Sequence, residues 1–229
     1  MKFTCAEGQI IEPKLCFIDC DGVIFDSNCS KTEAYRRTLL DMGESAENAE
    51  RFVQLHLADV SVSRFVKFKK YFGEMRGFPE PEASTQQAID NFGASVRKVY
   101  AELKPVPEAL QFVTSFGKCY VVSGGAQDEL CDVFTAHGIA NHFDAIYGSP
   151  TTKPEHVRTV LEQTGLRAQD CIFIGDGFTD FKTAQQFSIP FVFLRQMSDW
   201  KAADEQMATR TSSVTVCEHW RDLLGRCAF

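Results

Sequence analysis

Four short segments of this sequence carry residues that could perform chemistry on a phosphate group. Each combines acidic, hydroxyl or basic residues with glycine or proline, and the candidates are Asp19 and Asp21, Ser123 and Gly124, Lys153, and Asp176 and Asp180. Clustered carboxylates offer the oxygen ligands that Mg²⁺ prefers, and a carboxylate can also act as a nucleophile. A serine hydroxyl and glycine amides can hold phosphate oxygens, while a lysine adds positive charge. These residue types fit phosphoryl transfer at a magnesium site.

Each segment taken alone has a simpler explanation. The aspartate and serine segments are typical of turns at strand ends. Lys153 could be a solvated surface residue, and Thr179 or Asp180 could cap a helix. The order of the segments favours the chemical interpretation, because all four follow successive predicted strands.

Short apolar runs predict the strands that position these segments. The runs end in Gly, Ser or Asp and are too short for helices; they cover residues 14–19, 118–122, 145–147, 171–174 and 191–194. The stretches between them have helical periodicity and stop signals, over residues 108–116, 127–137 and 154–164. This alternation predicts an α/β fold with a Rossmann-like, doubly wound parallel sheet. The carboxyl ends of parallel strands share one edge, so we expect the four segments to converge there.

Residues 28–104 interrupt the alternation. They are rich in helix formers and contain no convincing strand, which predicts an all-helical domain inserted after the first strand. The predicted core domain is then residues 1–27 and 105–229. In the last 31 residues, the pattern predicts only an edge strand at 213–217 and a short helix at 220–224.

Composition limits the classes of partner and the compartment. The formal net charge is −7, which gives no general attraction to nucleic acid or to an anionic membrane. No apolar run approaches the roughly 18 residues of a membrane span. The nine cysteines are scattered, odd in number and without a C-x-x-C pair, so we expect reduced thiols in a cytoplasmic protein.

With all four motifs present in order, the sequence resembles the haloacid dehalogenase superfamily of phosphatases. The match is to the branch with a helical cap, as in phosphoglycolate phosphatase and β-phosphoglucomutase, and the motifs span most of the chain. The resemblance implies that Asp19 is the nucleophile and a metal ligand. It makes Asp21 the general acid and base, whose backbone carbonyl also contacts Mg²⁺. Asp176 then completes the metal site, and Asp180 orients metal-bound water or the active-site lysine.

The same resemblance assigns the phosphate-binding residues. Ser123 and Gly124 would bind the phosphoryl group, and Lys153 would steady both the nucleophile and the phosphate. Residues 22–27 would form a short flap leading into the cap. Relatives that act on halides or phosphonates typically lack a carboxylate at the position of Asp21, so its presence implies phosphate esters.

The predicted cap offers one candidate for substrate recognition. Residues 59–65 resemble the cap substrate loop of this branch, which makes Arg64 a candidate contact to an anionic or sugar group. An amphipathic helix with a solvated basic face explains Arg64 equally well. Lys67 and Lys70 are weaker candidates for the same contact. We favour a solvated face for them and for Lys69. The histidines, among them His56 and His156, lack metal-ligand spacing and are expected in packing or surface roles.

The leading hypothesis is therefore a Mg²⁺-dependent phosphatase for a small phosphorylated metabolite, such as a sugar phosphate or a phosphoglycolate-like acid. A phosphomutase of the β-phosphoglucomutase type uses the same motifs and remains an alternative. A more remote alternative is a non-catalytic scaffold with the same fold. We expect a monomer or a homodimer.

Overall fold

The computed structural model describes the chain except residues 7, 59, 61, 209–213 and 229. Contacts between residues divide it into two units. One consists of Met1–Asp26 with Lys104–Phe229, and the other of Ser27–Leu103. The breaks fall one residue before the predicted boundaries, and the assignment of the units as catalytic core and cap stays a prediction.

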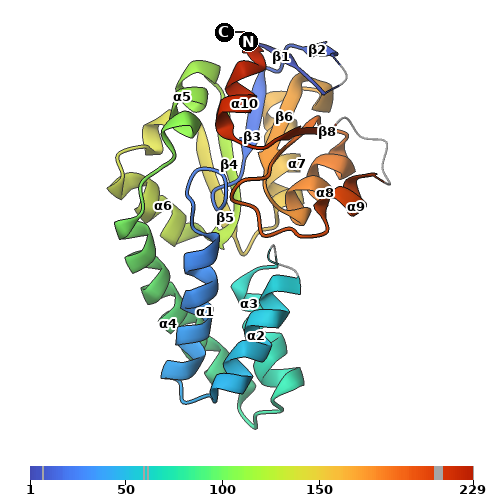
Figure 1. Ribbon diagram of the computed structural model, residues 1–229. Coiled ribbons are helices and arrows are strands. Elements are labelled where there is room, and N and C mark those ends of the chain that lie inside the picture. The colour runs from blue at the N-terminus through green and yellow to red at the C-terminus, as the bar shows by residue number, and fades with distance from the viewer. Residues whose placement is uncertain (7, 59, 61, 209–213, 229) are drawn as a thin grey trace. The chain divides into compact units, whose positions relative to one another are not determined.

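The first unit is built on a six-stranded sheet whose strand order is β5-β4-β3-β6-β7-β8 (Figure 1). Every neighbouring pair in it is parallel. The strands are β3 (Leu15–Ile18), β4 (Cys119–Ala126), β5 (Ala145–Ser149), β6 (Cys171–Gly175), β7 (Phe191–Leu194) and β8 (Val214–Cys217). The predicted α/β fold class is confirmed. The predicted edge strand is β8, although its first residue, Ser213, lies outside the described residues.

Helices cover both faces of this sheet, which is why its central strands are continuously apolar. Phe17 and Phe173 of the sheet belong to a core cluster with Phe181 of α8. Helices α7, α8 and α9 cover this face, while α5, α6 and α10 lie on the other face (Figure 1). The helices are α5 (Pro107–Phe116), α6 (Gln127–Ala136), α7 (Lys153–Thr164), α8 (Phe178–Phe187), α9 (Ala203–Ala208) and α10 (Trp220–Gly225). Short 3₁₀ turns occur at Ala140–His142 and Ala168–Asp170. No helix among the described residues is long and apolar enough to cross a bilayer.

A second, smaller sheet joins the two ends of the chain. It has the order β2-β1-β9 and is antiparallel, with Phe3 opposite both Ile11 and Cys227. Its strands are β1 (Lys2–Thr4), β2 (Ile10–Ile11) and β9 (Cys227–Ala228). Strands of two or three residues leave no readable periodicity, so the sequence pattern did not predict them.

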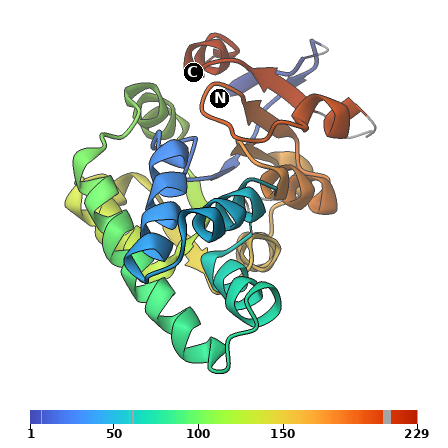
Figure 2. The same cartoon turned by 60° about the horizontal axis from the view of Figure 1, so that its bottom comes forward.

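The second unit contains only helices among its described residues (Figure 2). They are α1 (Asn28–Asp41), α2 (Ala46–Ala58), α3 (Arg64–Lys70), a π-helical turn at Tyr71–Met75, and α4 (Pro81–Glu102). Its core is aromatic. Tyr35 stacks on Phe92 with ring centroids 3.9 Å apart, and Phe52 stacks on Phe68 at 4.9 Å. The predicted all-helical secondary structure of the insertion is therefore confirmed for its described residues.

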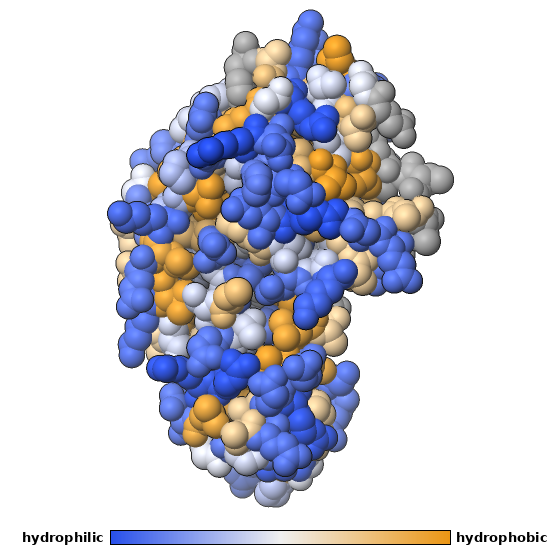
Figure 3. Space-filling model, viewed as in Figure 1, coloured by the Kyte–Doolittle hydropathy of each residue, from blue (hydrophilic) through white to orange (hydrophobic). Residues whose placement is uncertain are grey.

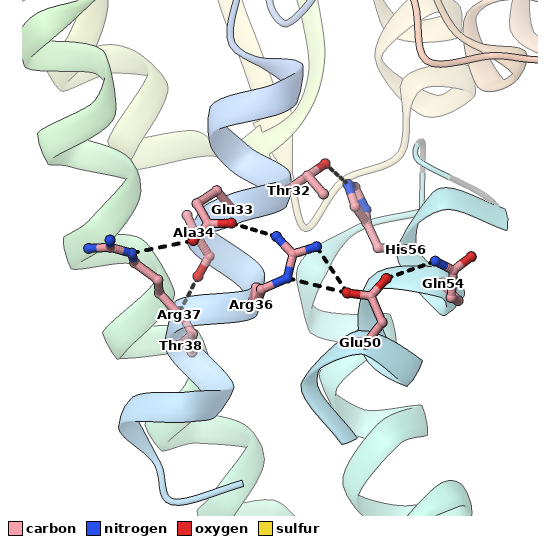
Figure 4. A network of polar contacts seen from close by, with 9 residues as sticks. All are labelled: Thr32, Glu33, Ala34, Arg36, Arg37, Thr38, Glu50, Gln54 and His56. Carbon is pink, nitrogen blue, oxygen red and sulfur yellow. Dashed lines mark hydrogen bonds and ion pairs between the residues drawn. The ribbon is translucent and has the colours of Figure 1, made fainter. Parts of the chain in front are cut away.

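Polar contacts on the surface of this unit connect α1 to α2 (Figure 4). Arg36 pairs with Glu33 in its own helix and with Glu50 of α2, where its Nη2 lies 3.0 Å from a carboxylate oxygen. Deeper between the same helices, the hydroxyl of Thr32 lies 3.2 Å from Nε2 of His56. The face of the unit seen in Figure 3 is mainly hydrophilic, in keeping with these charged helices.

Candidate active site

The predicted site residues lie at the carboxyl ends of neighbouring strands in the six-stranded sheet. Ile18 of β3 is in register with Val121 of β4 on one side and with Ile174 of β6 on the other. The amide of Asp19 donates to the carbonyl of Ile174 at 3.0 Å, which continues the pairing beyond the strand end. As a result, the residues that follow β3, β4 and β6 emerge at one edge of the sheet, as expected.

Lys153 brings two of the predicted aspartates together. Its Nζ lies 2.8 Å from Oδ2 of Asp19 and 2.5 Å from Oδ1 of Asp180. All three side chains are buried. Lys153 is the first residue of α7, whose start is fixed by Glu155 accepting hydrogen bonds from the amide and hydroxyl of Thr152. The helix start therefore determines where the ammonium group lies.

Three carboxylates gather around this lysine. Asp19, Asp176 and Asp180 each offer an oxygen, and these oxygens lie within 4.8 Å of one another. All three residues are buried, with exposed fractions of 7%, 6% and 1%. When ionised, they and Lys153 carry two net negative charges in a low-dielectric environment. A divalent cation with oxygen preference would balance that charge, so the donor set fits Mg²⁺.

The electrostatics of Asp19 support the same conclusion. Burial raises the pKa of Asp19 to about 7, helped by the Asp180 carboxylate and opposed by Lys153. For Lys153, burial lowers the pKa, but Asp180 and Asp19 outweigh it, so the ammonium stays charged. Lys153 alone thus does not compensate the carboxylates fully. A cation held among them would favour the ionised form of Asp19.

Two glycines allow Asp180 to approach the strand end. A Cβ atom at Gly175 would lie 2.4 Å from Cβ of Asp180 and 2.5 Å from its Cγ. The amide of Gly177 donates to Oδ2 of Asp180 at 3.0 Å. Because the other oxygen of Asp180 bonds Lys153, the carboxylate is held from both sides. The sequence pattern marked Gly175 only as a turn residue and missed this steric role.

Ser123 and Asp21 occupy the positions expected from the topology. Ser123 is buried within β4, which continues past the predicted end at residue 122 to Ala126. Its Oγ accepts a hydrogen bond from the amide of Gly125 at 3.1 Å. The carbonyl of Gly124 accepts from the hydroxyl of Ser149, which ties β4 to β5. Asp21 is half-buried in the turn after β3, where Gly22 takes a positive φ of 68°. The catalytic roles of these residues stay predictions.

The basic residues of the helical unit are placed differently from the sequence prediction. Lys67 is 3% exposed, so its assignment to a solvated face is wrong. Its Nζ lies 2.7 Å from Nδ1 of His56 and donates to the carbonyl of Val60 at 3.0 Å. Only Lys69 and Lys70 of the assigned lysines are exposed.

Arg64 is also not part of a solvated face. It is 4% exposed, and its guanidinium lies over the ring of Phe92, 4.6 Å from the ring centre. The proposed substrate loop, residues 59–65, includes two residues outside the described part of the chain. The role of Arg64 as a substrate contact stays a prediction.

Two polar side chains that the sequence pattern did not single out for this purpose hold β5 in place. The amide group of Gln127 donates to the carbonyl of Ile146 at 2.8 Å and accepts from the amide of Gly148 at 2.7 Å. His156 of α7 stacks on Tyr147, and its Nε2 lies 3.0 Å from the carbonyl oxygen of Gly148. The expected packing role of His156 is confirmed, and through it β5 fixes the helix that begins with Lys153.

A profile of haloacid dehalogenase-like hydrolases matches residues 13–188, which is most of the chain. No curated protein matches it.

Solved structures with the same fold include three hydrolases. A haloacid dehalogenase-like hydrolase from Streptococcus pneumoniae is 18% identical to this chain and has a TM-score of 0.69. The match covers 93% of this chain and 98% of that hydrolase. A predicted phosphoglycolate phosphatase from Haemophilus somnus is 18% identical, with a TM-score of 0.66, and the match covers 87% of this chain and 99% of that phosphatase. A predicted phosphatase from Clostridium acetobutylicum is 20% identical, with a TM-score of 0.64, and the match covers 90% of this chain and 94% of that phosphatase. At these identities, the similarity shows the fold.

Proposed function

The chain belongs to the haloacid dehalogenase-like hydrolase family, and we propose that it is a Mg²⁺-dependent phosphatase that acts on a small phosphate monoester. The observation that carries the proposal is the position of Lys153, which contacts Asp19 and Asp180 within a buried group of three aspartates. Such a group is costly to bury unless it binds a cation or a reacting group.

In the proposed reaction, Asp19 is the nucleophile. One of its carboxylate oxygens forms a bond to phosphorus as the bond from phosphorus to the leaving oxygen breaks, which gives an aspartyl phosphate. Asp21 donates a proton to the leaving oxygen. In the second half, Asp21 accepts a proton from water as the water oxygen bonds to phosphorus. The bond from phosphorus to the Asp19 oxygen breaks, which restores the Asp19 carboxylate and gives inorganic phosphate.

The other residues bind and orient the phosphoryl group. Lys153 places a positive charge next to the attacking carboxylate, and the hydroxyl of Ser123 with the amide of Gly124 would hold phosphate oxygens. Asp19, Asp176 and the carbonyl of Asp21 would hold Mg²⁺, with Asp180 close by. When bound, the metal supplies screening between these carboxylates and the anionic substrate.

We further propose that the helical unit is a cap that supplies substrate contacts, with Arg64 as the candidate for an anionic or sugar group. The substrate class is a small phosphorylated metabolite, and the protein is a monomer or homodimer. We propose the cytoplasm as its compartment, which is supported by nine cysteines that are all free thiols.

The test is the hydrolysis of a panel of phosphate esters, including a generic aryl phosphate, by wild type and Asp19→Asn with and without Mg²⁺. We expect wild type to release phosphate only with Mg²⁺ and Asp19→Asn to lose the activity, because the amide cannot form the aspartyl phosphate. Asp90→Asn, an exposed position on α4, should behave as wild type. Activity retained by Asp19→Asn would refute the mechanism.

The same assay separates the alternatives. Release of free phosphate without a bisphosphate activator supports the phosphatase, whereas a requirement for a sugar bisphosphate would support a phosphomutase. A wild-type protein that is inactive on the whole panel and does not bind Mg²⁺ would support the scaffold.

A further inference from the structure

The loop of residues 195–200, between β7 and α9, contacts the backbone of the proposed metal site. It lies beyond residues 13–188, the segment that matches the family profile. The amides of Arg195 and Gln196 donate to the carbonyls of Cys217 and Glu218, each at 3.0 Å, which extends the pairing of β7 with β8. The guanidinium of Arg195 also pairs with Asp204 and Glu218. The loop is therefore anchored to the edge of the sheet.

Trp200 anchors the other end of the loop against the helix that carries Asp180. Its ring lies 5.6 Å from the rings of both Phe178 and Phe181 of α8. Its indole Nε1 donates to the side chain of Gln206 at 3.0 Å. The end of the loop at Trp200 therefore packs against α8.

Between these anchors, Ser198 makes a direct contact to the metal-site backbone. Its hydroxyl donates to the carbonyl oxygen of Asp176 at 2.5 Å and accepts from the amide of Trp200 at 3.0 Å. Asp176 lies between Gly175 and Gly177, and glycine restricts backbone rotation less than any other residue. The peptide group between Asp176 and Gly177 is held on both sides, because its amide donates to Asp180 and its carbonyl accepts from Ser198. Ser198 supplies the one of these two contacts that comes from outside the segment.

We propose that Ser198 is a positioning residue, which holds the Asp176 carboxylate in the orientation that binds Mg²⁺. This inference rests on the proposed function, because it requires a metal at the carboxylate cluster. Partners just outside the ligand shell commonly change metal affinity by about 10- to 100-fold when they are removed. Ser198 acts through the backbone, so we expect the lower end, about 10-fold weaker Mg²⁺ binding for Ser198→Ala.

The experiment is calorimetric titration of the whole protein with Mg²⁺ alone, for wild type, Ser198→Ala and the isosteric pair Ser198→Thr and Ser198→Val. The threonine keeps the hydroxyl and the valine replaces it with a methyl group. Ser115→Ala is the matched control, since the Ser115 hydroxyl donates to a carbonyl within the exposed end of α5. Thermal unfolding without metal and hydrolysis at increasing Mg²⁺ are measured on the same samples.

We expect Ser198→Ala and Ser198→Val to bind Mg²⁺ about 10-fold more weakly and Ser198→Thr and Ser115→Ala to bind as wild type. Hydrolysis by the weakened variants should recover at high Mg²⁺, which loss of a merely structural contact would not produce. If Ser198→Ala does not fold, the threonine and valine variants decide the same question. Equal Mg²⁺ affinity for these two would overturn the inference. A wild-type protein without Mg²⁺ binding or hydrolysis would instead overturn the proposed function.

Discussion

Replacing Gly175 by alanine tests whether Asp180 owes its position to the missing side chain. The new Cβ would lie 2.4 Å from Cβ, 2.5 Å from Cγ and 2.7 Å from Oδ2 of Asp180. These atoms belong to the start of a side chain whose carboxylate is bonded to Lys153 and Gly177, so they cannot rotate away freely. We therefore expect the start of α8 to move away from β6.

The magnitude follows from two contributions. Overpacking in a buried position costs about 1–3 kcal/mol. Complete loss of a hydrogen bond to a buried charged group would add about 1.5–3 kcal/mol. Since a shift of the helix relieves part of the clash, we expect a loss of about 2–4 kcal/mol in the free energy of unfolding. In a chain of this size, each kcal/mol corresponds to roughly 2–4 °C in the unfolding midpoint.

The assays are thermal unfolding and phosphate release by the same preparations. A displacement of about 1 Å in a catalytic group can cost about 100-fold in rate, so we expect at least that loss of activity. Gly225→Ala is the control, because no atom lies within 4 Å of a Cβ built at that position, and its stability should stay within about 1 kcal/mol of wild type. If Gly175→Ala unfolds at the wild-type midpoint with full activity, the steric explanation of Asp180 is wrong.

Three further predictions concern charge and packing. The raised pKa of Asp19, about 7, means that the folded chain holds this proton more tightly than the unfolded chain. Without metal, the contribution of Asp19 to the free energy of unfolding should therefore fall as pH rises from about 4 to 7. Asp19→Asn should remove this fall, so that at pH 8 the variant is more stable than wild type by up to about 4 kcal/mol. Thermal unfolding in the presence of a chelator measures both effects. Lys67→Ala should lower the free energy of unfolding by about 1–3 kcal/mol, since Nδ1 of His56 and the carbonyl of Val60 lose their donor. Lys70→Ala, at an exposed position, should stay within about 0.5 kcal/mol of wild type. Equal effects of the two substitutions in urea unfolding would contradict the burial of Lys67. Gly148→Ala should cost about 1–3 kcal/mol, because the added Cβ would lie 2.7 Å from the carbonyl oxygen of Gly125; an unchanged urea midpoint would show that β5 can shift.

The convergence of the site could be predicted because it depends on topology and little else. The apolar runs that lead to Asp19, Ser123 and Asp176 are readable as strands, and parallel pairing then requires the carboxyl ends of these strands to share an edge. The family motifs added Lys153 at the start of the helix that follows β5. Each of these features is local in sequence, and one general rule of sheet geometry brings them together.

The environment of the basic residues on α3 could not be predicted in the same way. Hydrophobic periodicity treats lysine as polar, so Lys67 was assigned to solvent although it bonds His56 of the preceding helix. Whether a lysine is buried depends on a partner supplied by tertiary packing. Arg64 over the ring of Phe92 is the same kind of case, since 28 positions of sequence separate the two residues.

Contacts that depend on steric fit were also out of reach. The sequence pattern indicates Gly175 as one of several turn glycines, and only the fold shows that Asp180 fills the space where a side chain at Gly175 would be. Ser198 stands in a segment without periodicity, and its bond to the carbonyl of Asp176 joins positions 22 residues apart. The pairing of β1 with β9 spans nearly the whole chain and involves too few residues to leave a pattern.

The central position of β3 has a consequence for how the chain folds as it is made. Its four residues are fully buried between β4 and β6. It leaves the ribosome before the other five strands of its sheet, about 100 residues before β4 and more than 150 before β6. During that interval, an apolar strand with two open edges has no partner, which is the condition that favours aggregation or chaperone binding. Residues 27–103, by contrast, form a contiguous unit whose described elements are helices. Helical units generally fold faster than parallel sheets. Asp19, the predicted nucleophile, thus directly follows the strand of the six-stranded sheet whose two neighbours are made long after it.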